Sequence, residues 1–289
     1  MSQPTVICLG EVLWDMLPTE KVAGGAPMNV AFHLNQLGIS TAMVSKVGSD
    51  DLGKEIIDFL KQKNIRTDYL QQDDAHPTGT VKVCLDANGH PSYEIVENVA
   101  WDYIEATEQI IPLLKASRAL VFGTLMARSP ISRQTLLRFI EAAPVRVLDV
   151  NLRSPFFSKK LLDELLPLAD IVKMNDSELD IIAEWNAVKG TQHEKMSWIK
   201  SHYHTELLIV TRGEHGAIVL NSADEYIQHK GYEVVVKDTI GSGDAFLASY
   251  LSKHLRSESV ENCLDFACRM GAFVATQSGG TPDLPVWAR

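Results

Sequence analysis

Short apolar runs alternate with helix-length amphipathic segments along most of the chain, and this alternation restricts the fold more than any other feature of the sequence. Strands that alternate with helices form a mostly parallel sheet with helices packed on both of its faces. In such sheets, ligands bind at the carboxyl ends of the strands, in the loops that follow. Strands are predicted at residues 5–9, 42–47, 119–122, 145–150, 170–174, 207–211 and 216–220.

A length of 289 residues suits one large α/β domain with a small appendage. Residues 66–99 interrupt the alternation, because two strand-like runs flank Asn88-Gly89, a dipeptide that favours a tight hairpin turn. We expect this segment and residues 11–22 to form a small β-element, either a lid over the ligand edge of the sheet or a dimer surface. The α/β core would then comprise residues 1–10, 23–65 and 100–289.

The charge of the chain limits its partners. A net charge of −10 without any run of Lys or Arg argues against binding to nucleic acid or to an anionic membrane, since both need a clustered basic surface. The first residues lack the pattern of a secretory leader, and no uncharged apolar run reaches membrane length, so we expect a cytoplasmic protein. The four cysteines form no C-x-x-C pair, which favours buried reduced thiols.

The segment from Asp238 to Asp244, with the sequence DTIGSGD, leads directly into an apolar helix-like run. Gly241 and Gly243 permit close backbone approach, and the unpaired amides at a helix N-terminus attract an anion. Asp244 would hold a carboxylate that accepts a proton beside this anion, an arrangement suited to phosphoryl transfer to a hydroxyl. The alternative is an ordinary glycine turn in which Asp244 caps the helix.

Two segments near the N-terminus suit a polyol. Gly24 and Gly25 open a predicted helix that carries Asn29 in its first turn, so bare backbone and an amide side chain can bind hydroxyl groups. Asp15 follows the first strand, where a carboxylate can accept hydrogen bonds from a ligand. A structural helix start and a turn-forming Asp15 are the alternatives.

Three further motifs follow predicted strands. Asp149, Asn151 and Arg153 alternate with aliphatic residues and so face one side, either as a ligand site or as a structural Asp149–Arg153 pair. Asn175 and Glu178 have the spacing of a capping box, or alternatively lie near a triphosphate with Glu178 holding Mg²⁺ through water. Thr211, Gly213 and Gly216 form either a plain hairpin turn or a contact with nucleotide phosphates.

Taken together and in this order, these motifs resemble the ribokinase-like (PfkB) family of carbohydrate kinases over essentially the whole chain. The resemblance implies a three-layer α/β/α core with a mostly parallel central sheet and a small β-sheet lid. It also implies ATP and Mg²⁺ as cosubstrates and a sugar hydroxyl as the acceptor. The sequences around Asp15 and Asn151 are most similar to those of fructokinases, so fructose is the expected sugar.

By position, the resemblance assigns a role to each motif. Asp244 would be the base, and the amides of Gly241, Ser242 and Gly243 would hold the transferring phosphoryl group. Glu178 would hold Mg²⁺ through water, and Asp238 would begin a K⁺ site completed by residues 275–280. The sugar would contact Asp15, Gly24, Gly25, Asn29, Asn151 and Arg153, and ATP would contact Asn175, Thr211, Gly213 and Gly216.

Two positions depart from the family pattern. Ser242 stands where alanine is commonest, a mild change that should leave the anion site intact. Trp14 stands where the family usually has an aliphatic residue, and it would alter the sugar preference if it pointed into the site. The competing functions are a kinase for ribose, a nucleoside or 2-keto-3-deoxygluconate, and a catalytically silent sugar-binding protein. The lid could also join two copies in a homodimer.

Overall fold

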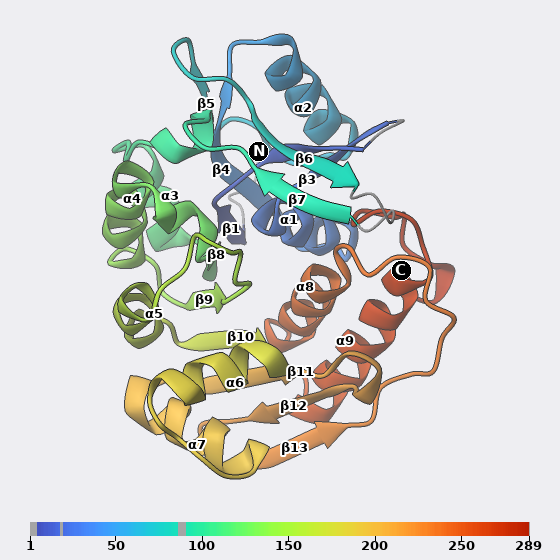
Figure 1. Cartoon of the computed structure of the whole chain (residues 1–289). Coiled ribbons are helices and arrows are strands. Elements are labelled where there is room, and N and C mark those ends of the chain that lie inside the picture. Colours follow the sequence, from blue (N-terminus) through green and yellow to red (C-terminus); the bar gives the residue numbers. More distant parts are fainter. Residues whose placement is uncertain (1–4, 18–19, 86–90, 289) are drawn as a thin grey trace.

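The computed structural model describes residues 5–17, 20–85 and 91–288, which form a large sheet flanked by helices and a small sheet (Figure 1). Within these residues the large sheet has nine strands in the order β13-β12-β11-β10-β9-β8-β1-β4-β5. It is parallel from β11 to β5, and β12 and β13 join antiparallel. The strands are β1 (Val6–Leu9), β4 (Thr41–Gly48), β5 (Leu70–Asp73), β8 (Ala119–Gly123), β9 (Arg146–Asp149), β10 (Ile171–Asn175), β11 (Leu207–Thr211), β12 (Ala217–Leu220) and β13 (Tyr226–His229).

Helices cover both faces of the large sheet, because successive side chains of a buried strand point to opposite faces. In β1, Val6 and Cys8 pack with one apolar core, and Ile7 and Leu9 pack with the other. The first core holds α1 (Ala26–Gln36), α2 (Asp51–Gln62), α8 (Ser242–His254) and α9 (Val260–Ala275). The second holds α3 (Ile110–Ala116), α4 (Pro130–Ile140), α5 (Lys159–Leu165), α6 (Asp176–Trp185) and α7 (Gln192–Tyr203).

The three-layer α/β/α fold expected from the alternation is therefore confirmed. Each of the seven predicted strands has a counterpart in the large sheet, with bounds that differ by at most one residue at either end. The sequence pattern did not predict β5 and β13, which lie at the two ends of the sheet and are only partly buried. Edge strands carry a weaker apolar signal because one side of the strand faces solvent.

The small sheet has the order β3-β2-β6-β7 and lies near α1 and α2 in the upper part of Figure 1. It differs from the expected small element in two respects. β5 lies in residues 66–99 but pairs with β4 in the large sheet, and β3 runs to Gly24, past the expected bound at residue 22. Asn88-Gly89 lies outside the described residues, although β6 and β7 on either side are antiparallel. Its strands are β2 (Leu13–Met16), β3 (Lys21–Gly24), β6 (Gly79–Leu85) and β7 (Pro91–Ile95).

Trp14 packs on α2. Its indole N–H donates a hydrogen bond to the Leu52 carbonyl at 3.0 Å, and its ring meets Phe59 edge to face. The side chain is 7% exposed. The unusual tryptophan thus fixes the small sheet to the core, and this packing explains its presence without a contact to sugar.

The remaining expectations on composition concern cysteines and membranes. Cys8, Cys263 and Cys268 are free and buried, as expected, and the side chain of Cys84 lies outside what the structure describes. In the described ranges, no helix combines the length and apolar character needed to cross a bilayer.

Candidate active site

The start of α8 forms a compact glycine turn at the carboxyl end of the large sheet. Gly241 precedes the helix with φ = 72°, a left-handed conformation that favours glycine, and no side chain caps the helix. A Cβ on Gly241 would lie 2.4 Å from the Cα of Gly280, so the two backbones touch. Ser242 donates through Oγ to the Gly271 carbonyl at 2.9 Å, which ties this turn to α9. The amides of the first turn are therefore left without a side-chain acceptor.

Asp244 lies in the first turn of α8 and does not cap it. Its Oδ2 accepts a 2.8 Å hydrogen bond from Asn29 Nδ2, so the contact joins α8 to α1. Burial raises the pKa of the Asp244 carboxyl, while the charge of Lys173, the Asn29 hydrogen bond and the charge of Arg153 oppose that shift. A buried carboxylate held by an amide and facing two cations can serve as a proton acceptor.

The small sheet contributes Asp15 and Gly24 from neighbouring antiparallel strands. A Cβ on Gly24 would lie 2.6 Å from Asp15 Oδ2, and one on Gly25, which has φ = 117°, would lie 2.4 Å from the Glu11 carbonyl oxygen. Gly25 is required for this close packing because it would meet backbone, whereas the Asp15 side chain could shift to admit a Cβ on Gly24. Burial raises the pKa of Asp15 to about 6, and the charge of Arg153 opposes the rise.

Asn29 connects this group of residues to Asp244. Its side chain is buried, and its Oδ1 has no hydrogen-bond partner among the residues that the structure describes. A buried amide oxygen left unpaired is costly, so it is available to accept a ligand hydroxyl. Asn151 is half-buried with φ = 38°, and Arg153 is exposed but close enough to influence several carboxyl groups.

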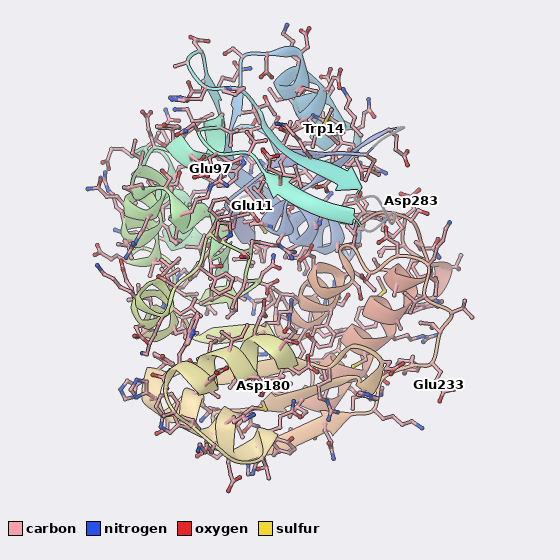
Figure 2. The ribbon with its side chains drawn as sticks, viewed as in Figure 1. Glu11, Trp14, Glu97, Asp180, Glu233 and Asp283 are labelled. Atoms are coloured by element: carbon pink, nitrogen blue, oxygen red, sulfur yellow. The ribbon has the colours of Figure 1, made fainter. Side chains whose placement is uncertain are left out.

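Glu11 is a buried acid that the sequence motifs did not single out. It is 2% exposed, its Oε1 accepts from the Ala26 amide at 3.3 Å, and its Oε2 is unpaired within the described part of the chain. Burial raises its pKa to about 7. In Figure 2, Glu11 lies toward the middle of the molecule, whereas Trp14 lies beside α2. A charged residue two positions after the end of an apolar strand was the available signal.

A pocket of about 420 Å³ adjoins the start of α8. Ser242 and Gly243 from the glycine turn line it, together with apolar side chains that include Val234, Phe246 and Ala272. Gly213 has φ = 55° and open space around it, whereas Gly216 packs tightly against the backbone near Gly231. The four residues expected to contact ATP all line this pocket, namely Asn175, Thr211, Gly213 and Gly216.

Asn175 and Glu178 form the capping box that was the structural alternative for this motif. Asn175 Oδ1 accepts from the Glu178 amide, and Glu178 Oε2 accepts from the Asn175 amide, each at 2.8 Å. Glu178 Oε1 also accepts from the Leu152 amide at 2.7 Å. One carboxylate thus joins the loop after β9 to the junction between β10 and α6. Each oxygen keeps a further lone pair, which fits a metal held through water rather than directly.

Lys173 and Asp149 form a buried ion pair beneath the glycine turn. Lys173 Nζ lies 3.0 and 3.1 Å from the two carboxylate oxygens of Asp149. The alternative pair between Asp149 and Arg153 does not form. Sequence reasoning missed Lys173, although a lysine inside an apolar strand is an unusual feature.

Asp238 lies outside this cluster and joins two backbone segments. Its Oδ1 accepts from the Ile240 amide and its Oδ2 from the Gly279 amide, both at 3.0 Å. The amides of Lys237 and Asp238 donate to the Ala275 carbonyl. The loop before the glycine turn is therefore held to the segment after α9.

Comparison with known proteins gives three informative similarities. Fructokinase-2 of Solanum habrochaites is 26% identical over 98% of this chain and 94% of its own length. An uncharacterized sugar kinase from Pyrococcus horikoshii, solved in complex with ATP, is 26% identical with a TM-score of 0.82, covering 96% of this chain and 94% of that one. A fructokinase double mutant from Vibrio cholerae, bound to fructose, ADP and potassium, is 23% identical with a TM-score of 0.83, covering 98% and 96%.

The nine-stranded, mostly parallel sheet with its smaller four-stranded sheet has the ribokinase-like α/β fold. Residues 9–287 match the pfkB family of carbohydrate kinases, so the chain belongs to that family. The family resemblance found in the motifs is thereby confirmed.

Proposed function

We propose that this protein is an ATP-dependent sugar kinase that transfers the γ-phosphoryl group of ATP to a hydroxyl of fructose. The observation that carries the proposal is the contact between Asn29 and Asp244, which supports Asp244 as a proton acceptor between the proposed sugar-binding residues and the glycine turn. The similarity to fructokinase-2 supports fructose, and that to the ATP-bound kinase supports ATP.

In the proposed reaction, Asp244 accepts the proton of the sugar hydroxyl as its oxygen attacks the γ-phosphorus. The bond to the ADP oxygen breaks, and the products are ADP, a sugar phosphate and one proton. The amides of Gly241, Ser242 and Gly243 and the N-terminus of α8 stabilise the charge on the transferring phosphoryl oxygens. Little covalent chemistry is demanded of the protein, so positioning and charge stabilisation supply most of the rate.

The nucleotide would lie in the 420 Å³ pocket, with its phosphates toward Ser242 and Gly243 and its base among apolar side chains. Thr211 and Asn175 would lie along its phosphates. Mg²⁺ bound with ATP neutralises phosphate charge, and Glu178 would hold it through water while keeping its two backbone contacts. A K⁺ site at Asp238 remains a prediction. It would be tested by comparing the kinase activity in a potassium salt with that in a tetramethylammonium salt.

On the acceptor side, Asp15, Gly24, Gly25 and Asn29 would bind sugar hydroxyls, and Asn151 and Arg153 would close that side. We propose that residues 11–22 and 66–99 act as a lid, because the small sheet provides Asp15 and Gly24. A homodimer through the same sheet is a further prediction, which light scattering would test. The cytoplasmic location likewise remains a prediction from the sequence.

The charges of the acceptor side favour a neutral sugar. Among the residues that the structure describes, two cations, Lys173 and Arg153, act on the carboxyl groups of Glu11, Asp15, Asp149 and Asp244. The site therefore has no excess positive charge to attract an acidic acceptor such as 2-keto-3-deoxygluconate.

A panel of acceptors with coupled detection of ADP tests the proposal. Fructose should give the highest kcat/KM among fructose, ribose, a nucleoside and 2-keto-3-deoxygluconate. A far higher value for another acceptor would replace fructose and leave the kinase assignment intact. Binding of sugar without any ADP release across the panel would instead indicate a silent sugar-binding protein.

A further inference from the structure

Lys173 is a buried cation in the middle of a parallel sheet. It is 6% exposed and stands in register with Asp149 on the neighbouring strand. Both side chains lie two residues after apolar residues of the α8 face, Ile171 and Val147, so they point toward α8. Taking an ammonium and a carboxylate out of water is costly, and packed apolar residues would serve the sheet equally well.

The ammonium of Lys173 lies against the glycine turn. A Cβ on Gly243 would come within 3.0 Å of Lys173 Nζ. The residue after Gly243 is Asp244. The pair with Asp149 fixes the ammonium at this position, since Nζ contacts both carboxylate oxygens.

Several elements bring charged or polar groups to Asp244. Lys173 is the buried cation among them, whereas Arg153 is exposed and therefore screened by solvent. Burial favours a protonated Asp244, so a cation is needed to keep it ionised. The groups are Lys173 from β10, Asp149 from β9, Arg153 from the loop after β9, Asn29 from α1 and Glu11 from the loop after β1.

We propose that Lys173 is a positioning residue for phosphoryl transfer: its ammonium, held by Asp149 against Gly243, keeps the Asp244 carboxylate charged and in place to accept the acceptor's proton. This inference rests on the proposed kinase function. Burial lowers the pKa of Lys173, but the carboxylates of Asp149, Asp244 and Glu178 outweigh it, so the pKa is raised and the side chain stays charged.

The test is the pH dependence of kcat/KM for the sugar in Lys173→Gln, whose amide can still donate to Asp149. An ionised Asp244 is the active form, so activity rises with pH as Asp244 loses its proton. Loss of the cation should move this acid limb to higher pH by about 1–3 units. Activity at pH 7 should fall at least tenfold and recover in part at pH 9.

Lys46→Gln is the matched control. Lys46 is also a buried strand lysine, and its Nζ pairs with Asp73 Oδ2 at 3.2 Å, away from α8. It should lose stability as Lys173→Gln does and keep the wild-type acid limb. An unmoved limb in folded Lys173→Gln, or an equal shift in both variants, would overturn the proposal.

A second variant tests the proposal even if Lys173→Gln does not fold. Asp149→Asn keeps one side-chain oxygen to accept from Lys173 Nζ and so still holds the ammonium, but it removes the partner charge. The acid limb should therefore move to lower pH, opposite to the first shift. No movement, or movement to higher pH, would contradict the proposal.

The titration of Asp244 can also be followed directly by carboxyl ¹³C NMR, with Asp244→Asn as the assignment control. If the wild-type protein phosphorylates no acceptor, the kinase function fails. The NMR titration of Asp244 in the same Lys173 and Asp149 variants still decides whether Lys173 sets its charge.

Discussion

The nucleotide side and the acceptor side of the candidate site are lined by different chemical groups. Glycine backbone and apolar side chains around the start of α8 form most of the nucleotide pocket. The acceptor side instead gathers buried acids, with Glu11 and Asp15 carrying raised pKa values of about 7 and about 6. Backbone amides bind phosphate at any pH near neutrality, whereas buried acids change their hydrogen bonding with pH. The acceptor side should therefore respond to pH and to polar substitutions more strongly than the nucleotide side.

The largest effect is expected at the boundary between the two sides. Asp244→Asn keeps the shape of the side chain but cannot take a proton, so kcat should fall by about 10²–10⁴. Folding should change little because Asp244 does not cap α8. ATP binding, measured by calorimetry, should stay near the wild-type value. Retention of more than about a tenth of kcat would show that Asp244 is not the base.

The acceptor side alone should respond to Asp15→Ala. Loss of a charged hydrogen bond costs about 1.5–3 kcal/mol, which corresponds to roughly tens-fold in sugar kcat/KM. Asn29→Ala should lower kcat as well, because Asn29 also holds Asp244. Steady-state kinetics with each substrate varied in turn separates the two results, and the KM for ATP should remain unchanged. Unaltered sugar kinetics in both variants would remove these residues from the site.

The nucleotide side alone should respond to Ala272→Leu, which adds volume to an apolar wall of the pocket. Overpacking costs about 1–3 kcal/mol, so the KM for ATP should rise roughly tenfold. The KM for sugar should not change, since Asp15 and Asn29 do not line this pocket. An equal rise in both KM values would mean that the two sides are not separate.

The smallest effect concerns stability. Glu11 has a folded-state pKa of about 7, above its value of 4.5 when solvated, so the folded state binds this proton more tightly. The protein then loses stability as pH rises through this window. Glu11→Gln should be more stable than wild type by about 1–3 kcal/mol at pH 8 and equal to it at pH 4. Urea unfolding at both pH values measures the difference, and a constant difference would argue against a buried, protonated Glu11.

The same contrast explains what the sequence could predict. The glycines of residues 238–244 signal an anion turn locally, because helix starts and positive φ angles depend on neighbouring residues. The core strands follow from apolar runs. Lys173 and Glu11 went unnoticed because their significance depends on which strands and loops meet in space. The partner of Asp149 was decided by the register between β9 and β10, which no local pattern contains.

The parallel pairing of β2 with β6 has a consequence for the order of folding. The chain between these strands contains β4, α2 and β5, which belong to the core. Contacts between residues far apart in the chain carry a loop-closure cost and form late unless other structure has already brought them together. The small sheet should therefore be completed, and Asp15 placed, only after β4, α2 and β5 have folded into the core. A partly folded chain would then lack Asp15 at the acceptor side of the candidate site.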